Sequence, residues 1–268
     1  MILPVTEAAD PCIADFRDVR ERDLVGRQGS FMAEGEVVLR LLVSRLGGAN
    51  SHRLRALLLS EAQAMRLADV ITALPEDVPI YVAGQKVMDQ VVGFPIHRGI
   101  LALGAARPLP EPGALLDRLG DRALVVAALG LTNHDNMGGI FRNAAAFGAD
   151  VVLIDAASCD PLYRKAIRVS VGASLVVPFA RVMDGASAVD LLKTRGFEVV
   201  ALSPAGREPL SRLVRPPRVA ALFGTEGPGL SDAVMAMTRT VAIPMAAGFD
   251  SLNVATTSGI VLHHLSGV

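Results

Sequence analysis

Short apolar runs alternate with helical segments through the second half of the chain, and this alternation most constrains the fold. The runs are apolar on both faces, as expected of strands that are covered from both sides. We predict strands at 123–129, 151–155, 174–179, 198–202, 219–223 and 240–244, and helices at 138–147, 162–169, 187–194, 230–237 and 252–265. The pattern indicates an α/β domain with a parallel sheet between two layers of helices. Ligands of such sheets bind at the carboxyl ends of the strands.

The first half of the chain predicts a smaller α/β domain. Its strands are expected at 54–59, 80–83 and 100–104, and its helices at 35–46 and 61–69. Residues 105–113 hold three prolines in nine positions, which is typical of a linker. We therefore divide the chain into a domain at 1–104, a linker at 105–120 and a second domain at 121–268.

Composition excludes several classes of protein. Two cysteines, Cys12 and Cys159, provide neither a disulfide framework nor a metal cluster, which favours a reducing compartment. The amino-terminal residues lack the basic and apolar regions of a signal peptide. The apolar runs are also far shorter than the ~20 residues of a membrane helix. We expect a soluble, cytoplasmic protein without a membrane partner.

The charge balance leaves a nucleic-acid partner open. A net charge of −1 argues weakly against one, because nucleic-acid-binding domains usually carry a basic surface. However, 23 of the 26 basic residues are arginines, and eight of these lie between positions 17 and 55. Arginine suits phosphate and base recognition, but a GC-rich genome would produce the same bias. Both explanations stand at this point.

A first polar loop follows the first predicted strand of the second domain. Asn136 is placed to cap the helix that Gly138 opens, and glycines there let a ligand approach the backbone. Arg142 lies one turn further along an otherwise small and apolar helix. His134 is the one histidine of five that we keep as a site candidate, and none of the five has metal-ligand spacing. Alternatively, Asn136 is only a cap and Arg142 only a surface residue.

A second loop, Gly-x-x-Gly-x-Gly, follows the strand at 219–223. The order differs from the dinucleotide fingerprint Gly-x-Gly-x-x-Gly, and no Gly-Lys-Ser/Thr follows. Glu226 at its centre would repel a phosphate at the helix N-terminus, so a phosphate-binding loop is disfavoured. A carboxylate among exposed amides suits a neutral or cationic ligand. The alternative is a tight strand-to-helix connection with Glu226 as the cap.

A third loop precedes the last helix. Ser251 fits an N-cap, since the apolar helix begins at Leu252. Asn253 would then lie in the first turn, where its helix propensity is poor, and its side chain is better explained by a specific partner. A purely structural role is the alternative.

Together and in this order, the three loops resemble the motifs of the SpoU/TrmH family of RNA ribose 2′-O-methyltransferases, in the SPOUT superfamily. The motifs are Asn-x-Gly-x-x-x-Arg, then Gly-x-Glu-Gly-x-Gly-Leu after a strand, then Ile-Pro-Met followed by Ser-Leu-Asn-Val. The resemblance spans 123–268 and includes a connecting segment at 164–172. The first half is similar more loosely, through Phe31–Gly35 and His97–Ile100. One departure is Asp135, where the family often has proline.

The resemblance implies a fold, a cofactor and roles for individual residues. The fold would be a catalytic α/β domain with a trefoil knot that binds S-adenosylmethionine, preceded by a small RNA-binding domain similar to ribosomal-protein folds. A homodimer is implied, and no metal. Arg142 would activate the ribose hydroxyl. The residues that would orient Arg142 and the ribose are Asn136, Ser251 and Asn253. Glu226 would either shape its loop or act near the substrate. The implied cofactor-binding residues are Ser203, Gly224, Gly229, Ile243, Met245 and Leu252.

The resulting hypothesis is methyl transfer from S-adenosylmethionine to a ribose 2′-hydroxyl of RNA. Ribosomal RNA is favoured because an RNA-binding domain accompanies the catalytic one, and transfer RNA is the alternative. A non-catalytic RNA-binding protein on the same fold is disfavoured because Asn136, Arg142, Ser251 and Asn253 are all present. A nucleotide-dependent oxidoreductase is disfavoured by the glycine order and Glu226. The RNA, the nucleotide and the choice between base and electrostatic stabiliser for Arg142 stay open.

Overall fold

The computed structural model describes residues 2–17, 29–48, 51–93, 96, 98–225, 227–246 and 251–267. The chain forms two compact units. Unit 1 comprises Met1–Arg107 together with Leu162–Val176, and unit 2 comprises Pro108–Pro161 and Val177–Val268. The segment Leu162–Val176 thus folds with unit 1, although the chain enters and leaves it from unit 2.

Unit 1 is built on a five-stranded mixed sheet with the order β1-β4-β3-β5-β2. Strands β1, β4 and β3 are parallel, and β5 runs antiparallel to both β3 and β2. The bounds are β1 (Ile2–Val5), β2 (Ser30–Glu34), β3 (Arg53–Ser60), β4 (Ile80–Ala83) and β5 (Ile100–Ala105). The three predicted strands are confirmed to within one residue. The sequence analysis missed β1 and β2, two short edge strands of which β1 contains a proline, because neither alternates clearly between apolar and polar residues.

Helices cover both faces of this sheet. On one face, η1 (Pro11–Phe16) and α5 (Gln85–Val92) bury Ile13, Phe16, Met88 and Val91 against alternate residues of the central strands. On the other, α2 (Glu36–Val43) contacts β2, and α3 (Glu61–Arg66) contacts β3 and β4. The helix α8 (Arg164–Val169) contacts β2, and the short η2 (Ala173–Leu175) follows it.

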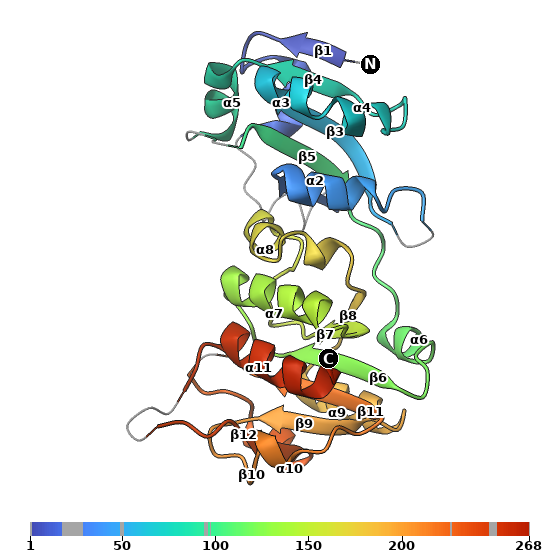
Figure 1. Cartoon of the computed structure of the whole chain (residues 1–268), viewed down its shortest axis with the longest axis vertical. Helices are drawn as coiled ribbons and strands as arrows, with labels where there is room; N and C mark the ends of the chain where they lie inside the picture. The colour runs from blue at the N-terminus through green and yellow to red at the C-terminus, as the bar shows by residue number, and fades with distance from the viewer. Residues whose placement is uncertain are drawn as a thin grey trace. The chain divides into compact units, whose positions relative to one another are not determined.

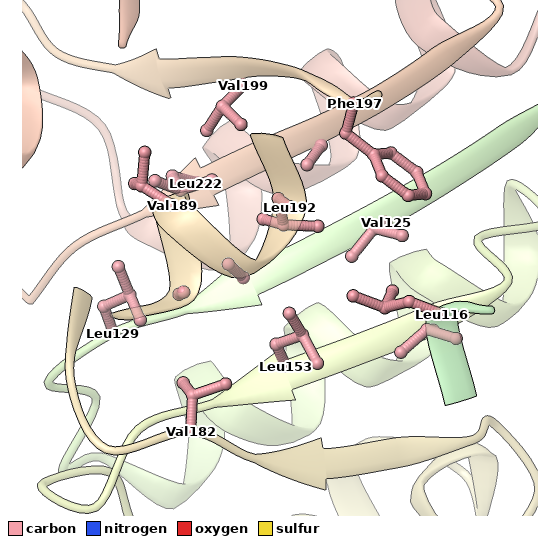
Figure 2. Close-up of a cluster of buried hydrophobic side chains, with 14 of the residues drawn as sticks. Leu116, Val125, Leu129, Leu153, Val182, Val189, Leu192, Phe197, Val199 and Leu222 are labelled. Carbon is pink, nitrogen blue, oxygen red and sulfur yellow. The ribbon is translucent and has the colours of Figure 1, made fainter. Parts of the chain in front are cut away.

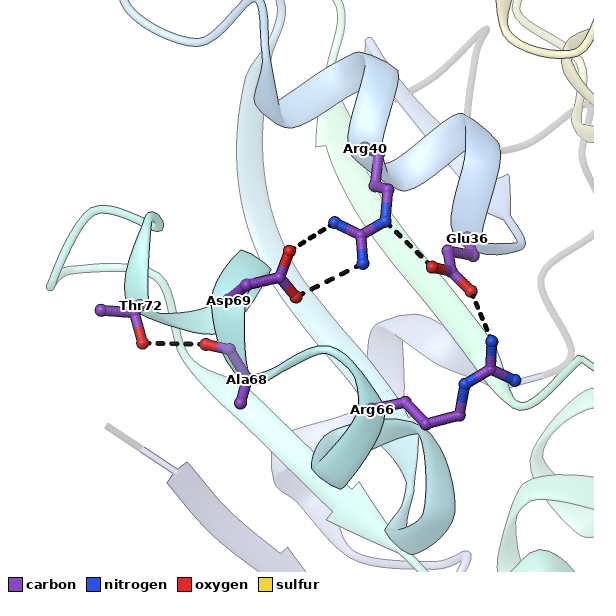
Figure 3. Close-up of polar contacts among 6 residues, drawn as sticks. All are labelled: Glu36, Arg40, Arg66, Ala68, Asp69 and Thr72. Carbon is purple, nitrogen blue, oxygen red and sulfur yellow. Dashed lines mark hydrogen bonds and ion pairs between the residues drawn. The ribbon is translucent and has the colours of Figure 1, made fainter.

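A network of exposed ion pairs joins α2 to its neighbours (Figure 3). The predicted helix at 61–69 breaks at Leu67 into α3 and α4 (Ala68–Thr72). Arg40 bonds to Glu36 at 2.9 Å and to Asp69 at 2.6 Å, and Arg66 reaches Glu36 at 3.2 Å. Exposed ion pairs add little stability each, so this network contributes little to the free energy of unfolding.

A buried histidine closes the end of unit 1's sheet. His52 is 4% exposed, its Nδ1 accepts the Arg107 amide hydrogen at 3.2 Å, and its ring stacks edge-on with Phe31 at 5.1 Å. Burial, with a smaller contribution from Arg107, lowers the pKa of His52 from its ordinary 6.5 to about 4. The folded state therefore holds this imidazole neutral.

Protonation of His52 is expected to destabilise the protein in acid. Because the folded-state pKa lies below the unfolded one, its contribution is complete above pH 6.5 and is lost as the pH falls towards 4. The loss by pH 4.5 is on the order of 2–3 kcal/mol. His52→Asn keeps an acceptor for the Arg107 amide but does not titrate. Denaturant unfolding at pH 7.5 and 4.5 should therefore show a smaller pH effect in the variant, and an identical effect in both proteins would contradict the prediction.

Unit 2 contains a seven-stranded sheet with the order β10-β12-β9-β11-β6-β7-β8. Every pair within it is parallel, as predicted. The bounds are β6 (Ala123–Ala128), β7 (Val151–Ile154), β8 (Phe179–Arg181), β9 (Glu198–Leu202), β10 (Glu208–Pro209), β11 (Arg218–Phe223) and β12 (Arg239–Ala242). The central strands β6 and β11 carry apolar residues on both faces, which is why helices can cover both.

Two helical layers enclose this sheet. On one face, α6 (Pro112–Leu116), α9 (Gly185–Lys193) and α10 (Asp232–Ala236) pack on alternate strand residues; Figure 2 shows this cluster, in which Leu192 of α9 lies near Val125 of β6. On the other face, α7 (His134–Ala146) contacts β6 and α11 (Val254–Ser266) contacts β11. Figure 1 shows α7 and α11 side by side on that face. The parallel sheet thus lies between two helix layers.

The predicted strand at 174–179 is wrong. The chain forms η2 there and enters β8 only at Phe179, after Pro178. The reason lies upstream, because Val171 and Gly172 both adopt left-handed backbone conformations, with φ of 55° and 83°, and turn the chain sharply after α8. A Cβ at Gly172 would lie 3.0 Å from Leu41 Cδ2, so this turn also packs closely against α2.

Val171 is the one non-glycine residue with positive φ in the described part of the chain. A left-handed conformation costs an L-residue ~1–2 kcal/mol, and asparagine tolerates it better. We expect Val171→Asn to raise the free energy of unfolding by about 1 kcal/mol in denaturant titrations. Val176→Asn, at an ordinary φ of −121°, is the control and should not stabilise. A loss of stability in Val171→Asn would contradict the expectation.

Candidate active site

A cavity of about 350 Å³ opens at the carboxyl ends of β9, β11 and β12. It is lined by segments from three loops and by the start of α11: Leu202, Ser203, Pro204, Phe223, Gly224, Thr225, Gly227, Gly229, Val241, Ile243, Met245, Ser251, Leu252, Asn253, Val254 and Thr257. All six residues expected to surround a cofactor line it. None of the described lining residues is basic, which is unsuited to a phosphate-rich ligand.

The glycines of the loop after β11 let the backbone fold back on itself. A Cβ at Gly224 would lie 2.5 Å from Gly229 C and Leu230 N, and Thr225 pairs with Gly229 in an antiparallel bridge. Gly227 and Gly229 have φ of 89° and 70°, which favours glycine at both. The spacing Gly-x-x-Gly-x-Gly thus reflects one close approach and two left-handed residues. Glu226 lies outside the described residues, as does His97.

The loop after β12 brings the expected site residues Ser251 and Leu252 to the cavity, but the start of the helix that follows differs from the prediction. The predicted N-cap Ser251 is wrong: α11 begins at Val254 and its N-cap is Asn253. The Asn253 Oδ1 accepts the amide hydrogens of Ala255 at 2.9 Å and Thr256 at 3.2 Å. Because it satisfies two free amides at the start of the helix, Asn253 is the N-cap in place of Ser251. Ser251 and Leu252 lie before the helix and line the cavity.

The N-terminus of α7 is likewise shifted. The predicted cap Asn136 is wrong, since Asn133 caps a helix that begins at His134 and accepts from the Asp135 amide at 2.8 Å. Asn136 therefore lies in the first turn, where it is 4% exposed. Its Oδ1 accepts a hydrogen bond from Asn253 Nδ2 at 2.8 Å. The first and third loops thus meet through two asparagines, one of which lines the cavity.

Arg142 lies two turns into α7 and is exposed. Within the described residues, it has no hydrogen-bond or ion-pair partner, and it does not line the cavity. An exposed guanidinium without a protein partner is available to an anionic ligand. His134 opens α7 and does not line the cavity either.

Helices α7 and α11 cross at very short range. A Cβ at Gly139 would lie 2.5 Å from Ala255 Cβ, so glycine permits the crossing. Further along, Phe147 and His263 stack edge-on with centroids 5.6 Å apart. The helix that carries Arg142 is therefore packed directly on the helix that lines the cavity.

Residues 123–263 match the sequence profile described as the SpoU rRNA Methylase family. The chain belongs to this family. The match covers β6 through most of α11 and therefore the whole cavity.

Relatives of this SpoU-family chain match nearly all of its length. It is 38% identical over 270 residues to an uncharacterized tRNA/rRNA methyltransferase of Mycobacterium bovis, covering 97% of this chain and 90% of the relative. Among solved structures, an RNA 2′-O ribose methyltransferase is 25% identical, with a TM-score of 0.79 and 98% of both chains covered. An AdoMet-bound rRNA methyltransferase from Sinorhizobium meliloti, 23% identical with a TM-score of 0.79 and covering 98% of this chain and 97% of that one, has the same fold.

One supporting element of the SpoU-family site was missed from sequence. Asp155, 8% exposed at the end of β7, accepts the Gly130 amide hydrogen at 3.0 Å and the Ser158 hydroxyl at 2.6 Å. The Ser158 Oγ in turn accepts the Leu131 amide hydrogen at 2.9 Å. This network fixes the loop that leads to Asn133. The sequence signal that could have predicted this network is an acidic residue at the end of an apolar strand, three residues before a serine.

Among the described residues of the SpoU-family chain, no helix combines the length and apolarity needed to cross a membrane.

Proposed function

We propose that the chain is an S-adenosylmethionine-dependent RNA methyltransferase that modifies a ribose 2′-hydroxyl. The observation that carries the proposal is the cavity itself, in which loops after β9, β11 and β12 converge beside the Asn136–Asn253 pair. The RNA 2′-O ribose methyltransferase that matches 98% of the chain supports the reaction, and the AdoMet-bound neighbour supports the cofactor.

The lining residues fit this cofactor. Phe223, Ile243 and Leu252 offer apolar surface to an adenine ring, and the glycine loop offers backbone hydrogen-bonding groups to a ribose. The cofactor carries no phosphate, which agrees with the absence of basic residues among those described in the lining. Glu226, in the same loop by sequence, is compatible with a cationic sulfonium.

The bound cofactor supplies an electrophilic methyl group, and the chain must hold and activate the acceptor hydroxyl. Free arginine has a pKa above ~12 and is a poor base. We assign Arg142 the role of holding the phosphate next to the target ribose and stabilising the developing alkoxide. Asn136, Ser251 and Asn253 orient the ribose and the start of α7.

The remaining features of the proposal concern partners and topology. RNA binding is assigned to the predicted domain at 1–104, which makes up most of unit 1 and precedes the predicted linker at 105–120. Ribosomal RNA is the proposed substrate and transfer RNA the alternative. A homodimer is supported by the exposed apolar side chain of Ile260 on α11, at 41%. A trefoil knot is part of the proposal on the ground of the SpoU family match alone.

Two measurements test the function. Calorimetry should give saturable binding of S-adenosylhomocysteine and none of NAD(P), and the reverse would refute the assignment. Mapping 2′-O-methylation across total RNA from cells with and without the gene should reveal a site that disappears on deletion and returns with the purified enzyme. A site in transfer RNA would replace the ribosomal substrate, and the absence of any lost site would contradict the activity.

A further inference from the structure

Asn143, the residue after Arg142, joins α7 to α11. Its Nδ2 donates to the Ala255 carbonyl oxygen at 2.7 Å and lies 2.8 Å from the Ser258 Oγ. Glycine at 259 makes room for this amide, because a Cβ there would lie 3.3 Å from Asn143 Nδ2. The asparagine is therefore held from three sides by small residues of α11.

The α11 turn that receives this amide has two faces. Val254 and Thr257 line the cavity, whereas Ala255 and the fully buried Ser258 meet Asn143. Consecutive residues of one helical turn move together, because their backbone hydrogen bonds fix their spacing. A displacement of the cavity wall at Val254 therefore displaces the carbonyl oxygen to which Asn143 is bonded.

A second hydrogen bond, between Asn136 and Asn253, also holds α7 to the start of α11. Asn136 accepts from Asn253 at 2.8 Å, seven residues before Asn143 on the same face of α7. Two bonds spaced by two helical turns fix both the rotation and the position of the intervening helix. Arg142 lies at the end of that fixed segment.

From this arrangement we infer that Asn143 is a positioning residue that couples the cofactor cavity to Arg142. A ligand that orders the first turn of α11 also orders the Arg142 turn of α7, so the cofactor prepares the RNA-facing side of the site. The inference rests on the proposed function, in which Arg142 acts on the ribose.

The test replaces Asn143 with leucine, which keeps the side-chain volume and removes the donor; Ser258 Oγ still bonds to Ala255 at 2.8 Å. Asn143→Asp is a second variant with the native shape. The control is His263→Ala, which removes a contact of the same helix pair at its far end. With tritiated S-adenosylmethionine and total RNA from cells lacking the gene, kcat should fall at least about tenfold in the Asn143 variants. The Kd for S-adenosylhomocysteine should stay within about twofold, and His263→Ala should keep its kcat.

Hydrogen exchange gives a readout independent of activity. In the wild type, S-adenosylhomocysteine should slow exchange both in the first turn of α11 and in α7 around Asn143, whereas in Asn143→Leu the slowing should be confined to α11. Wild-type kcat in both variants, equal losses in His263→Ala, or α7 protection that persists in the variants would each overturn the inference. If the wild type binds no S-adenosylhomocysteine, the proposed function fails and the inference with it.

Discussion

Arg142→Ala is expected to lower methyl transfer by ~10²–10³-fold while the affinity for S-adenosylhomocysteine changes by no more than about twofold. The size of the effect follows from removing a charged donor that acts on developing negative charge, which is worth that factor in other enzymes. The cofactor affinity should survive because Arg142 is exposed and does not line the cavity. Single-turnover transfer to undermethylated RNA and calorimetry measure the two quantities.

Two companion variants sharpen the result. Arg118→Ala removes another exposed arginine of unit 2 that has no ion pair among the described residues, and it should leave transfer unchanged. Arg142→Lys keeps the charge but loses the planar fork, so a role in gripping a phosphate predicts a partial loss. Full activity in Arg142→Ala would show that the acceptor hydroxyl is activated elsewhere.

Gly224→Ala is expected to weaken binding of S-adenosylhomocysteine by ~10–100-fold. The new methyl group would lie 2.5 Å from the backbone at Gly229 and Leu230, and neither atom can move without opening the loop that lines the cavity. Accommodating such a group typically costs ~1–3 kcal/mol. Calorimetry and the free energy of unfolding together separate a loss of binding from a loss of folding.

Other glycines provide matched controls for this substitution. In Gly120→Ala the new Cβ would have no atom within 4 Å and the backbone needs no unusual φ, so binding of S-adenosylhomocysteine should be unchanged. In Gly227→Ala the new Cβ would have no atom within 4 Å, but a φ of 89° is strained for alanine. This variant therefore measures the effect of backbone strain in the same loop without a steric clash. If Gly224→Ala binds as well as Gly120→Ala, the close approach at Gly224 does not shape the cavity.

Most strands and helices of unit 2 could be predicted from the sequence, because the pattern of buried apolar residues determines where they form. Strands such as β9 and β11 are apolar on both faces, and their short length between helical segments favours a strand over a helix. Helix starts were less predictable. Asn133, Asn136, Ser251 and Asn253 are all good caps, and the choice among them depends on which amides each side chain reaches in the folded chain.

The pairing within the site could not be read from local patterns. The sequence indicated that Asn253 needs a partner, but the partner, Asn136, lies 117 residues away. The two loops meet where α7 packs on α11, and glycine at 139, which permits that close packing, is a weak signal when read alone. The false strand at 174–179 has a similar origin, since a left-handed valine cannot be anticipated from apolar periodicity.

The placement of Leu162–Val176 with unit 1 has a consequence for how the chain behaves when cut. Cleavage in the proline-rich connection near residue 108 would sever the backbone once, yet the two fragments would stay associated, because α8 belongs to the carboxyl-terminal fragment and packs on β2 of the amino-terminal one. The nicked protein would behave as a split pair held by side-chain packing. Neither unit can therefore be excised as one uninterrupted piece of the gene.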